Sequence, residues 1–268
     1  MKVPLEWLRE FVPIRHRPDE LARRLTMAGL EVTGIDRVEN ELVLDLEITP
    51  NRPDCLSIIG VAREVAAITG AKLKLPGLAQ GSRLKARGEK PRASSLEPPA
   101  KLTIRIEDRK GCARYLGRLI EGVRIGPSPA WMQSRLLACG LRPINNVVDI
   151  TNYVLLEYGQ PLHAFDYRLL HEGTIVVRRA KEHEQLLALD GNQYLLLAGA
   201  LVIADRDRPI AVAGVIGGQE TAVNEHTTHM VLESAWFDPL PVRRTARALG
   251  LSSESSYRFE RGVDPVGV

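Results

Sequence analysis

A chain of 268 residues is long enough to bury a large core, either as one large domain or as two of modest size. Its apolar content of 44% and charged content of 26% are typical of a globular protein, which excludes a fibrous or largely disordered chain. The net charge of +3 permits a polyanionic partner without requiring one. No apolar run approaches the roughly 20 residues of a membrane span, and no signal peptide precedes the first amphipathic segment, so we expect no membrane association and a cytoplasmic location.

The cysteines and histidines give no indication of a disulfide framework or a metal site. The cysteines are odd in number and far apart, with no CxxC pair, which suits a reducing compartment. The histidines have no metal-ligand spacing, and the pair His226 and His229 lies in a polar turn, where a surface role is the better interpretation. The chain also lacks a P-loop, a GxGxxG after a strand, and the HExxH and GxSxG motifs. We therefore expect neither a metal nor a cofactor.

Residues 1–75 read as a small α+β domain. A short helix is expected from Leu5 to Pro13, and a second from Pro18 to the stop at Gly29. Clean alternation over residues 42–48 predicts a half-buried strand, and a third helix is expected over 57–68. The rigid polar segment 49–57 between them is interpreted as a strand-to-helix connection with capping residues, although a site remains the alternative.

Residues 76–100 are rich in Gly, Ser, Pro and basic side chains and have no apolar periodicity. This composition predicts a linker and a domain boundary. Its positive charges could contact a phosphate backbone, but a solvated basic linker is the simpler interpretation.

Residues 101–268 alternate between strand and helix patterns, which predicts a larger mixed domain with a multi-stranded β core, and an α+β class for the whole chain. Ser128-Pro129 is expected to cap a helix ended by Gly140, and Asp190-Gly191 to form the turn of a hairpin. Asp238-Pro239 opens a further helix. Strands are expected over residues 102–106, 115–122, 174–177, 185–197 (as the hairpin), 201–204, 210–215 and 230–235.

Two features of this second domain call for a chemical explanation. The apolar stretch 145–166 carries many polar groups, and burying them is costly unless they are paired or used. It is either a helix with one wet face followed by a turn, or a pocket wall with Thr151, Asn152 and His163 pointing inward. Glu233 lies in a strand that otherwise reads as buried, and its carboxylate is either in a structural ion pair or in a binding site. The pattern leaves both pairs of alternatives open.

Several long motifs identify a family resemblance. From Met1 to its end the chain resembles the N-terminal part of the β subunit of bacterial phenylalanyl-tRNA synthetase. In the family an oligonucleotide-binding-fold domain is inserted after the LEV-type segment, whereas here Val38 runs almost directly into the strand at Leu42; the family also continues well beyond the last motif. The matching motifs are LTMAGLEV (25–32), TPNRPDCLSIIGVAREVA (49–66), RYLGR (114–118), VVDITNYVLLEYGQPLHAFD (147–166), LDG (189–191), AGVIGG (213–218), ESAWFDP (233–239) and SYRFERGVDP (256–265).

The resemblance implies that residues 101–268 are the family's editing-type domain, which hydrolyses tyrosine wrongly esterified to the phenylalanine tRNA. Aminoacylation belongs to the α subunit and is not expected of this chain alone. The family's pocket transfers to Thr151, Asn152 and His163, with Ala213 and Gly214 as backbone wall and Glu233 as the carboxylate that reads the tyrosine hydroxyl. The pattern does not decide whether His163 activates the hydrolytic water or holds the terminal ribose.

The implied partners are mischarged Tyr-tRNA(Phe), the α subunit and the remaining β domains. Weak phosphate contacts are expected from three arginines. Asp149, Glu157 and Gln160 are expected to have structural or solvent-facing roles. A non-catalytic tRNA-binding or structural module, or a truncated chain, is the alternative to a hydrolase. The arginines are Arg243, Arg244 and Arg247.

Overall fold

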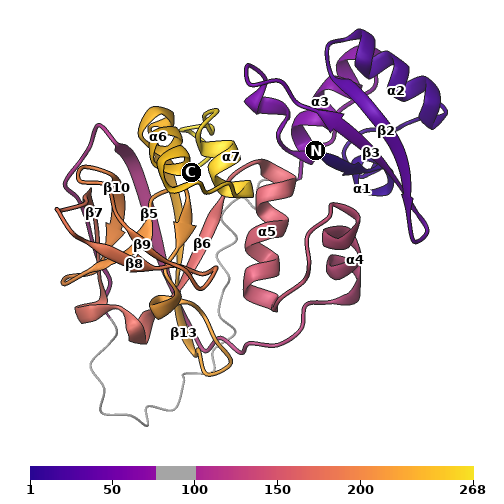
Figure 1. The fold of residues 1–268 in the computed structure, drawn as a ribbon. Coiled ribbons are helices and arrows are strands. Elements are labelled where there is room, and N and C mark those ends of the chain that lie inside the picture. Colours follow the sequence, from indigo (N-terminus) through magenta and orange to yellow (C-terminus); the bar gives the residue numbers. More distant parts are fainter. Residues whose placement is uncertain (77–100) are drawn as a thin grey trace.

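The computed structural model describes residues 1–76 and 101–268, and it has the predicted α+β class (Figure 1). Nearly all of the expected linker, 76–100, lies outside the described residues. None of the helices in the two described ranges is both long and apolar enough to cross a membrane.

The N-terminal lobe consists of a three-stranded antiparallel sheet with three helices (Figure 1). Two strands of this sheet were not predicted: β1 is only three residues long, and β2 is mostly exposed, so neither shows a strong alternation of buried and exposed residues. The strand at 42–48 and all three helices are confirmed. The elements are β1 (Lys2–Pro4), α1 (Leu5–Arg9), α2 (Pro18–Met27), β2 (Glu31–Val38), β3 (Glu41–Glu47), a 3-10 turn (Pro53–Cys55) and α3 (Ile58–Thr69).

β2 and β3 form a hairpin at the place where the resemblance implies an inserted domain. Val38 pairs with Glu41, so only Glu39 and Asn40 form the turn. Glu39 has a φ of 54°, the left-handed conformation that a two-residue hairpin turn requires. The antiparallel ladder then continues to Glu31 opposite Glu47. The chain therefore closes this junction with a continuous hairpin.

The C-terminal lobe is built on two sheets that share one core. A five-stranded sheet has the order β12-β11-β10-β7-β4, with β4 parallel to β7, and a three-stranded antiparallel sheet has the order β5-β13-β6. The two-stranded hairpin β8-β9 turns at Asp190-Gly191 as predicted. The strands are β4 (Thr103–Ile106), β5 (Cys112–Glu121), β6 (Leu162–Asp166), β7 (Thr174–Arg179), β8 (Gln185–Leu187), β9 (Gln193–Leu195), β10 (Leu201–Ala204), β11 (Pro209–Val212), β12 (Ile216–Gly217) and β13 (His229–Phe237).

Four helices accompany these sheets: α4 (Ala130–Ala138), α5 (Asn146–Tyr158), α6 (Pro239–Leu249) and α7 (Glu254–Phe259). Side chains of both sheets and of α6 and α7 form one buried cluster. The second cluster combines the N-terminal lobe with α4 and α5, which come later in the chain. Trp7 of α1, for example, stacks on Tyr153 of α5 with ring centroids 4.5 Å apart. The domain boundary at the linker remains a prediction. The second core contains residues that come before the linker in the sequence and residues that come after it.

One capping prediction is wrong. Ser128 does not cap α4, whose N-cap is Pro129 without a side-chain hydrogen bond. The Ser128 hydroxyl donates instead to the buried carboxylate of Asp149 on α5, which also accepts from the Ile144 N–H at 2.8 Å. The buried carboxylate offers a charge-assisted bond, which is stronger than a neutral capping bond. The contact joins α5 to the segment that precedes α4.

Candidate functional site

The stretch 145–166 becomes a helix followed by a strand, and one side of it lines a cavity. Asn145 caps α5 by accepting from the N–H groups of Val147 and Val148, and Gly159 ends the helix with a φ of 80°. The chain then enters β6 at Leu162. A cavity of about 250 Å³ lies among α5, β6, the β11–β12 turn, β13 and α7, where the two sheets of the C-terminal lobe meet. The stretch therefore forms part of the cavity wall, with Asn152 of α5 and His163 of β6 both in the lining.

Glu233 lies on the core-facing side of the three-stranded sheet. In β13 the buried positions alternate, and Glu233 takes the place between Val231 and Ala235 where an apolar residue is expected. It lines the cavity and is 6% exposed. Burial raises the pKa of its carboxyl to about 8, and a hydrogen bond from Tyr115 works against that rise. No basic side chain within the described ranges pairs with Glu233, so the structural ion pair that its position allowed is absent there.

His163 is the direct cross-strand neighbour of Glu233, on β6. Directly opposite residues in an antiparallel pair project from the same face, so both side chains point toward the cavity. The His163 Nε2 atom is enclosed and has no hydrogen-bond partner among residues 1–76 and 101–268. Burial lowers the pKa of its imidazole to about 4, which keeps the ring neutral at physiological pH. An unpaired buried nitrogen is costly in a folded protein, and one enclosed in this way can meet a ligand only when the ring turns it toward the cavity.

The two predicted residues of α5 have different positions. Asn152 lines the cavity. Thr151 is buried beside it but is not part of the lining, and its hydroxyl donates to the Val148 carbonyl of its own helix at 2.7 Å. This back-bond is a common use of a helical threonine. Thr151 therefore supports the wall from behind in this state.

The turn between β11 and β12 brings backbone to the cavity. The Val215 N–H donates to the Val212 carbonyl at 3.0 Å, with Ala213 and Gly214 at the two central positions. Gly214 has a φ of 70°, which a type II turn demands at this place and which favours glycine. A Cβ on Gly214 would also lie 3.0 Å from the Phe259 ring. Gly214 lines the cavity, whereas Ala213 is buried just behind the lining.

Several residues outside the predicted set also build the site, and of these the glycines of the 213–218 motif had indicated a close backbone approach. Gly217 of β12 approaches the imidazole so closely that a Cβ would lie 2.5 Å from His163 Cε1. The start of α7 and Phe259 close another side of the cavity, with Ser253 capping the helix and donating to the Val215 carbonyl at 2.8 Å. Ser253 and Ser256 form a capping box at the start of α7, and a serine at an N-cap position is the signal that could have revealed this helix. Tyr115 follows the β5 alternation and reads as an ordinary core residue.

The remaining polar groups of stretch 145–166 have structural partners, as expected. Glu157 accepts from the Trp7 indole at 3.0 Å, and Gln160 donates to the Ala235 carbonyl at 3.0 Å. The three arginines of α6 are exposed and do not line the cavity. Their role as phosphate contacts stays a prediction.

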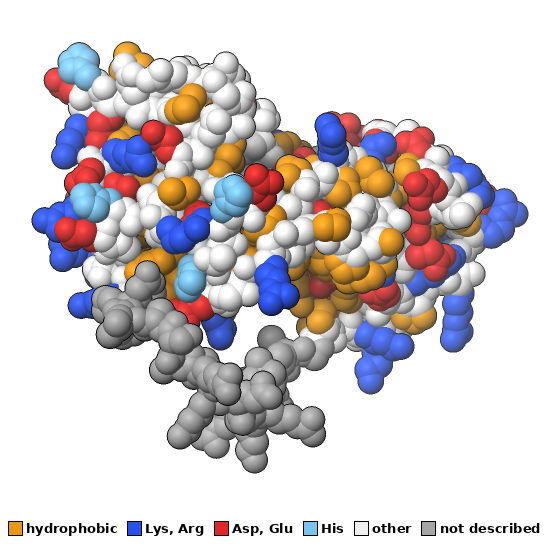
Figure 2. Space-filling model, turned by 90° about the horizontal axis from the view of Figure 1, so that it is seen from below, with side chains coloured by type: hydrophobic (Ala, Val, Ile, Leu, Met, Phe, Trp, Pro, Cys, Tyr) orange, Lys and Arg blue, Asp and Glu red, His pale blue; other side chains and the backbone are white. Residues whose placement is uncertain are grey.

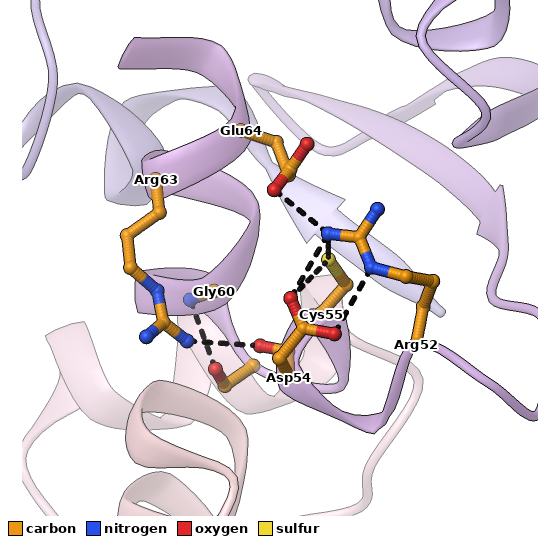
Figure 3. A network of polar contacts seen from close by, with 7 residues as sticks. Arg52, Asp54, Cys55, Gly60, Arg63 and Glu64 are labelled. Atoms are coloured by element: carbon orange, nitrogen blue, oxygen red, sulfur yellow. Dashed lines mark hydrogen bonds and ion pairs between the residues drawn. The ribbon is translucent and has the colours of Figure 1, made fainter. Parts of the chain in front are cut away.

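The polar segment 49–57 forms a closed network away from the cavity (Figure 3). Asp54, Cys55 and Glu64 bring three ligand atoms together, but the Arg52 guanidinium lies among them, with Nη2 at 2.9 Å from Asp54 Oδ2 and 2.7 Å from Glu64 Oε1. Burial raises the pKa of the Cys55 thiol to about 12, so it stays protonated. A Cβ on Gly60 would lie 1.9 Å from the Asp54 carbonyl oxygen, so the turn packs directly on α3. The network is a structural connection, capped by Ser57 on the Gly60 N–H.

Comparison with known proteins identifies the family of the chain. A family model described as the B3/4 domain matches residues 111–268, which include every residue that lines the cavity. The match covers more than half of the chain, and the chain belongs to the B3/4 domain family.

The chain is also similar over its whole length to phenylalanine–tRNA ligase beta subunits. It is 48% identical over 268 residues to that of Rhodopirellula baltica, covering 100% of this chain and 38% of that protein. It is 54% identical over 254 residues to that of Moorella thermoacetica, covering 93% and 30%. The resemblance inferred from the motifs is thus confirmed, and the chain spans about a third of the length of these relatives.

Among solved structures, an N-terminal fragment of the phenylalanyl-tRNA synthetase beta subunit from Pyrococcus horikoshii aligns with a TM-score of 0.46 and 16% identity. That alignment covers 95% of this chain and 73% of that chain.

Proposed function

We propose that this chain proofreads by hydrolysis, cleaving the ester of tyrosine wrongly attached to the phenylalanine tRNA. The observation that carries the proposal is the pairing of Glu233 and His163 on neighbouring strands of one cavity. A buried carboxyl without a basic partner and a buried imidazole nitrogen without any partner are both costly in a folded protein. A ligand with a hydroxyl and a nearby ester would satisfy both.

Glu233 supplies the selectivity in this proposal. One carboxyl oxygen, Oε2, accepts from the Tyr115 hydroxyl at 3.0 Å, which leaves Oε1 for a ligand. A tyrosine side chain would place its para-hydroxyl on Oε1, whereas phenylalanine would leave that oxygen buried and unpaired. A site built in this way rejects the analogue that lacks the hydroxyl by as much as ~10⁴–10⁵. Packing alone could not achieve this, because the two side chains differ by one atom.

His163 is better suited to holding water or a ribose hydroxyl than to removing a proton completely. Its pKa of about 4 makes it a weak base at neutral pH, and a general base works best with a pKa near the operating pH. The neutral ring can accept or donate a hydrogen bond at Nε2 once it turns this enclosed nitrogen toward the cavity. We infer a positioning role for His163, with Asn152 orienting the ester or the amino group from α5.

The Gly214 turn would stabilise the charge that develops on the ester oxygen. The N–H of Gly214 has no acceptor among the described residues, and Gly214 lines the cavity. A backbone donor aimed at a developing oxyanion is worth roughly 3–4 kcal/mol in hydrolases that use one.

Transfer RNA is the proposed partner, together with the α subunit and the β domains that the relatives possess. On the face shown in Figure 2, basic side chains are interspersed with acidic ones instead of forming one positive field. We propose that the exposed arginines of α6 supply contacts to the phosphates of the tRNA. We place the reaction in the cytoplasm, where translation takes place.

The deciding experiment follows deacylation of tyrosyl-tRNA(Phe) and phenylalanyl-tRNA(Phe) by the purified chain. We expect faster cleavage of the tyrosyl ester, loss of that activity in His163→Gln, and retention in His226→Gln, which replaces an exposed histidine outside the cavity. If neither ester is cleaved faster than in buffer, or both equally, the proposal fails. Binding of the tRNA without cleavage would instead identify a non-catalytic module.

A further inference from the structure

Tyr115 is a buried tyrosine that does not line the cavity but reaches the carboxyl of Glu233. It lies on β5 and is 6% exposed, and its hydroxyl donates to Glu233 Oε2 at 3.0 Å. Burial and the neighbouring Glu233 carboxyl raise the pKa of this phenol well above its ordinary value, so it remains a donor at any physiological pH. The carboxyl of Glu233, which we propose recognises the hydroxyl of a substrate tyrosine, is therefore already bound to the hydroxyl of Tyr115.

The two oxygens of Glu233 have different surroundings. Oε2 is bound by Tyr115, whereas Oε1 has no donor among the described residues. Unlike His163 Nε2, Oε1 is not fully enclosed by the described protein atoms. Glu233 also lines the cavity. Oε1 is thus the oxygen open to the cavity. Without Tyr115 the carboxyl could rotate, and either oxygen could face inward.

We propose that Tyr115 is a specificity-positioning residue, which holds Glu233 by Oε2 so that Oε1 alone is presented to a substrate hydroxyl. The expected effect on substrate selectivity rests on the proposed function. The hydrogen bond that holds Glu233 does not, because it is present whatever the site binds. The register supports it, because Tyr115 pairs with Ala235 while Glu233 pairs with Gly117. Glycine at 117 leaves the carboxyl beside a position without a side chain, so the phenol hydroxyl is its one protein hydrogen-bond partner within the described ranges.

Four groups face or influence the Glu233 carboxyl and have to be considered in any titration. Tyr115 and Cys112 approach from β5, His163 from β6, and Glu254 from the start of α7. Burial raises the pKa of the Cys112 thiol to about 12 and lowers that of His163 to about 4, so both stay neutral around pH 8. Glu254 is held by an ion pair with Arg258 at 2.6 Å. The carboxyl of Glu233 is then the group that changes charge in the cavity near pH 8.

The test removes only the phenol oxygen, with Tyr115→Phe in the full chain. We expect the ratio of tyrosyl-ester to phenylalanyl-ester cleavage (as kcat/KM) to fall roughly 3- to 10-fold near pH 7, the effect of losing one hydrogen bond to a carboxyl that is mostly protonated below pH 8. In a Glu233→Gln background the same substitution should change the ratio by less than about twofold, because the partner is gone. Tyr194→Phe is the matched control, since its hydroxyl donates to the Asp190 carboxylate at 2.6 Å and it does not line the cavity.

A second measurement is independent of catalysis. Carboxyl-carbon NMR of glutamate-labelled protein, with the Glu233 signal assigned through Glu233→Gln, should show the Glu233 pKa rising by roughly 1 unit or more in Tyr115→Phe, because the lost bond favours the charged form. An unchanged pKa overturns the inference whether or not the chain cleaves any ester. If the wild type cleaves neither ester but the pKa rises, the proposed function fails and the positioning stands. An unchanged cleavage ratio in an active protein, or an equal loss in both backgrounds, would reduce Tyr115 to a structural residue.

Discussion

Replacing Glu233 by glutamine should change how stability depends on pH. Burial raises the pKa of Glu233 to about 8 in the folded chain, against an ordinary value of 4.5. Between these two values the folded protein keeps a proton that the unfolded chain has lost, so the free energy of unfolding falls as pH rises through this window. The difference of 8 − 4.5 units corresponds to roughly 5 kcal/mol at the upper end, and relaxation of the folded chain makes this an upper bound.

His163 produces a slope of opposite sign at lower pH. Burial lowers its pKa from 6.5 to about 4, so the unfolded chain binds the extra proton in that interval and stability rises with pH. The two effects oppose each other between 4.5 and 6.5. Above 6.5 only the Glu233 effect continues, up to about pH 8. That window, 8 − 6.5 units wide, isolates about 2 kcal/mol for Glu233.

The assay is urea unfolding at pH 6.5, 7.5 and 8.5. The wild type should lose about 2 kcal/mol relative to Glu233→Gln across this range, because glutamine cannot ionise. Glu225→Gln serves as the control, since Glu225 is exposed in the turn before β13. A difference between wild type and Glu233→Gln that stays constant with pH would refute the reasoning, because it would mean that the carboxyl ionises in the folded protein as it does in the unfolded chain.

Three further predictions concern the rest of the site. His163→Ala should lower tyrosyl-tRNA deacylation by roughly 100-fold in single-turnover assays, because a group that positions the reactants is lost, and a wild-type rate would exclude a role for the imidazole. Gly217→Ala should destabilise the fold by about 1–3 kcal/mol and lower activity, because its Cβ would lie 2.5 Å from His163 Cε1; unchanged melting and activity would show that the ring moves freely. Replacing the α6 arginines with glutamine should reduce the salt slope of tRNA binding by up to about 3, measured by filter binding, and an unchanged slope would contradict their proposed contacts. These are Arg243, Arg244 and Arg247.

Some elements with clear start and stop residues were predicted well, although the cap at Ser128 was assigned wrongly and α7, which Ser253 caps, was missed. Ser57 and Gly70 mark the two ends of α3, as cap and as left-handed stop, and Asp190-Gly191 marks the β8–β9 turn. The strands without such signals were missed. β6 follows α5 after only a short connection, and β2 has no continuous buried face, so neither produces the alternation on which the prediction depends.

The sequence by itself determined that Glu233 interrupts a buried strand and that stretch 145–166 holds more polar groups than its apolar content explains. Its motifs also determined the family, and with it the residues proposed for the pocket. Only the tertiary structure decided which of those residues meet. Glu233 and His163 are 70 positions apart, and the β6–β13 register makes them neighbours, whereas Thr151 turns to its own helix and Tyr115 takes hold of the carboxyl. Pairing between strands depends on contacts between distant parts of the chain. A local sequence pattern therefore does not predict which polar side chains will become neighbours.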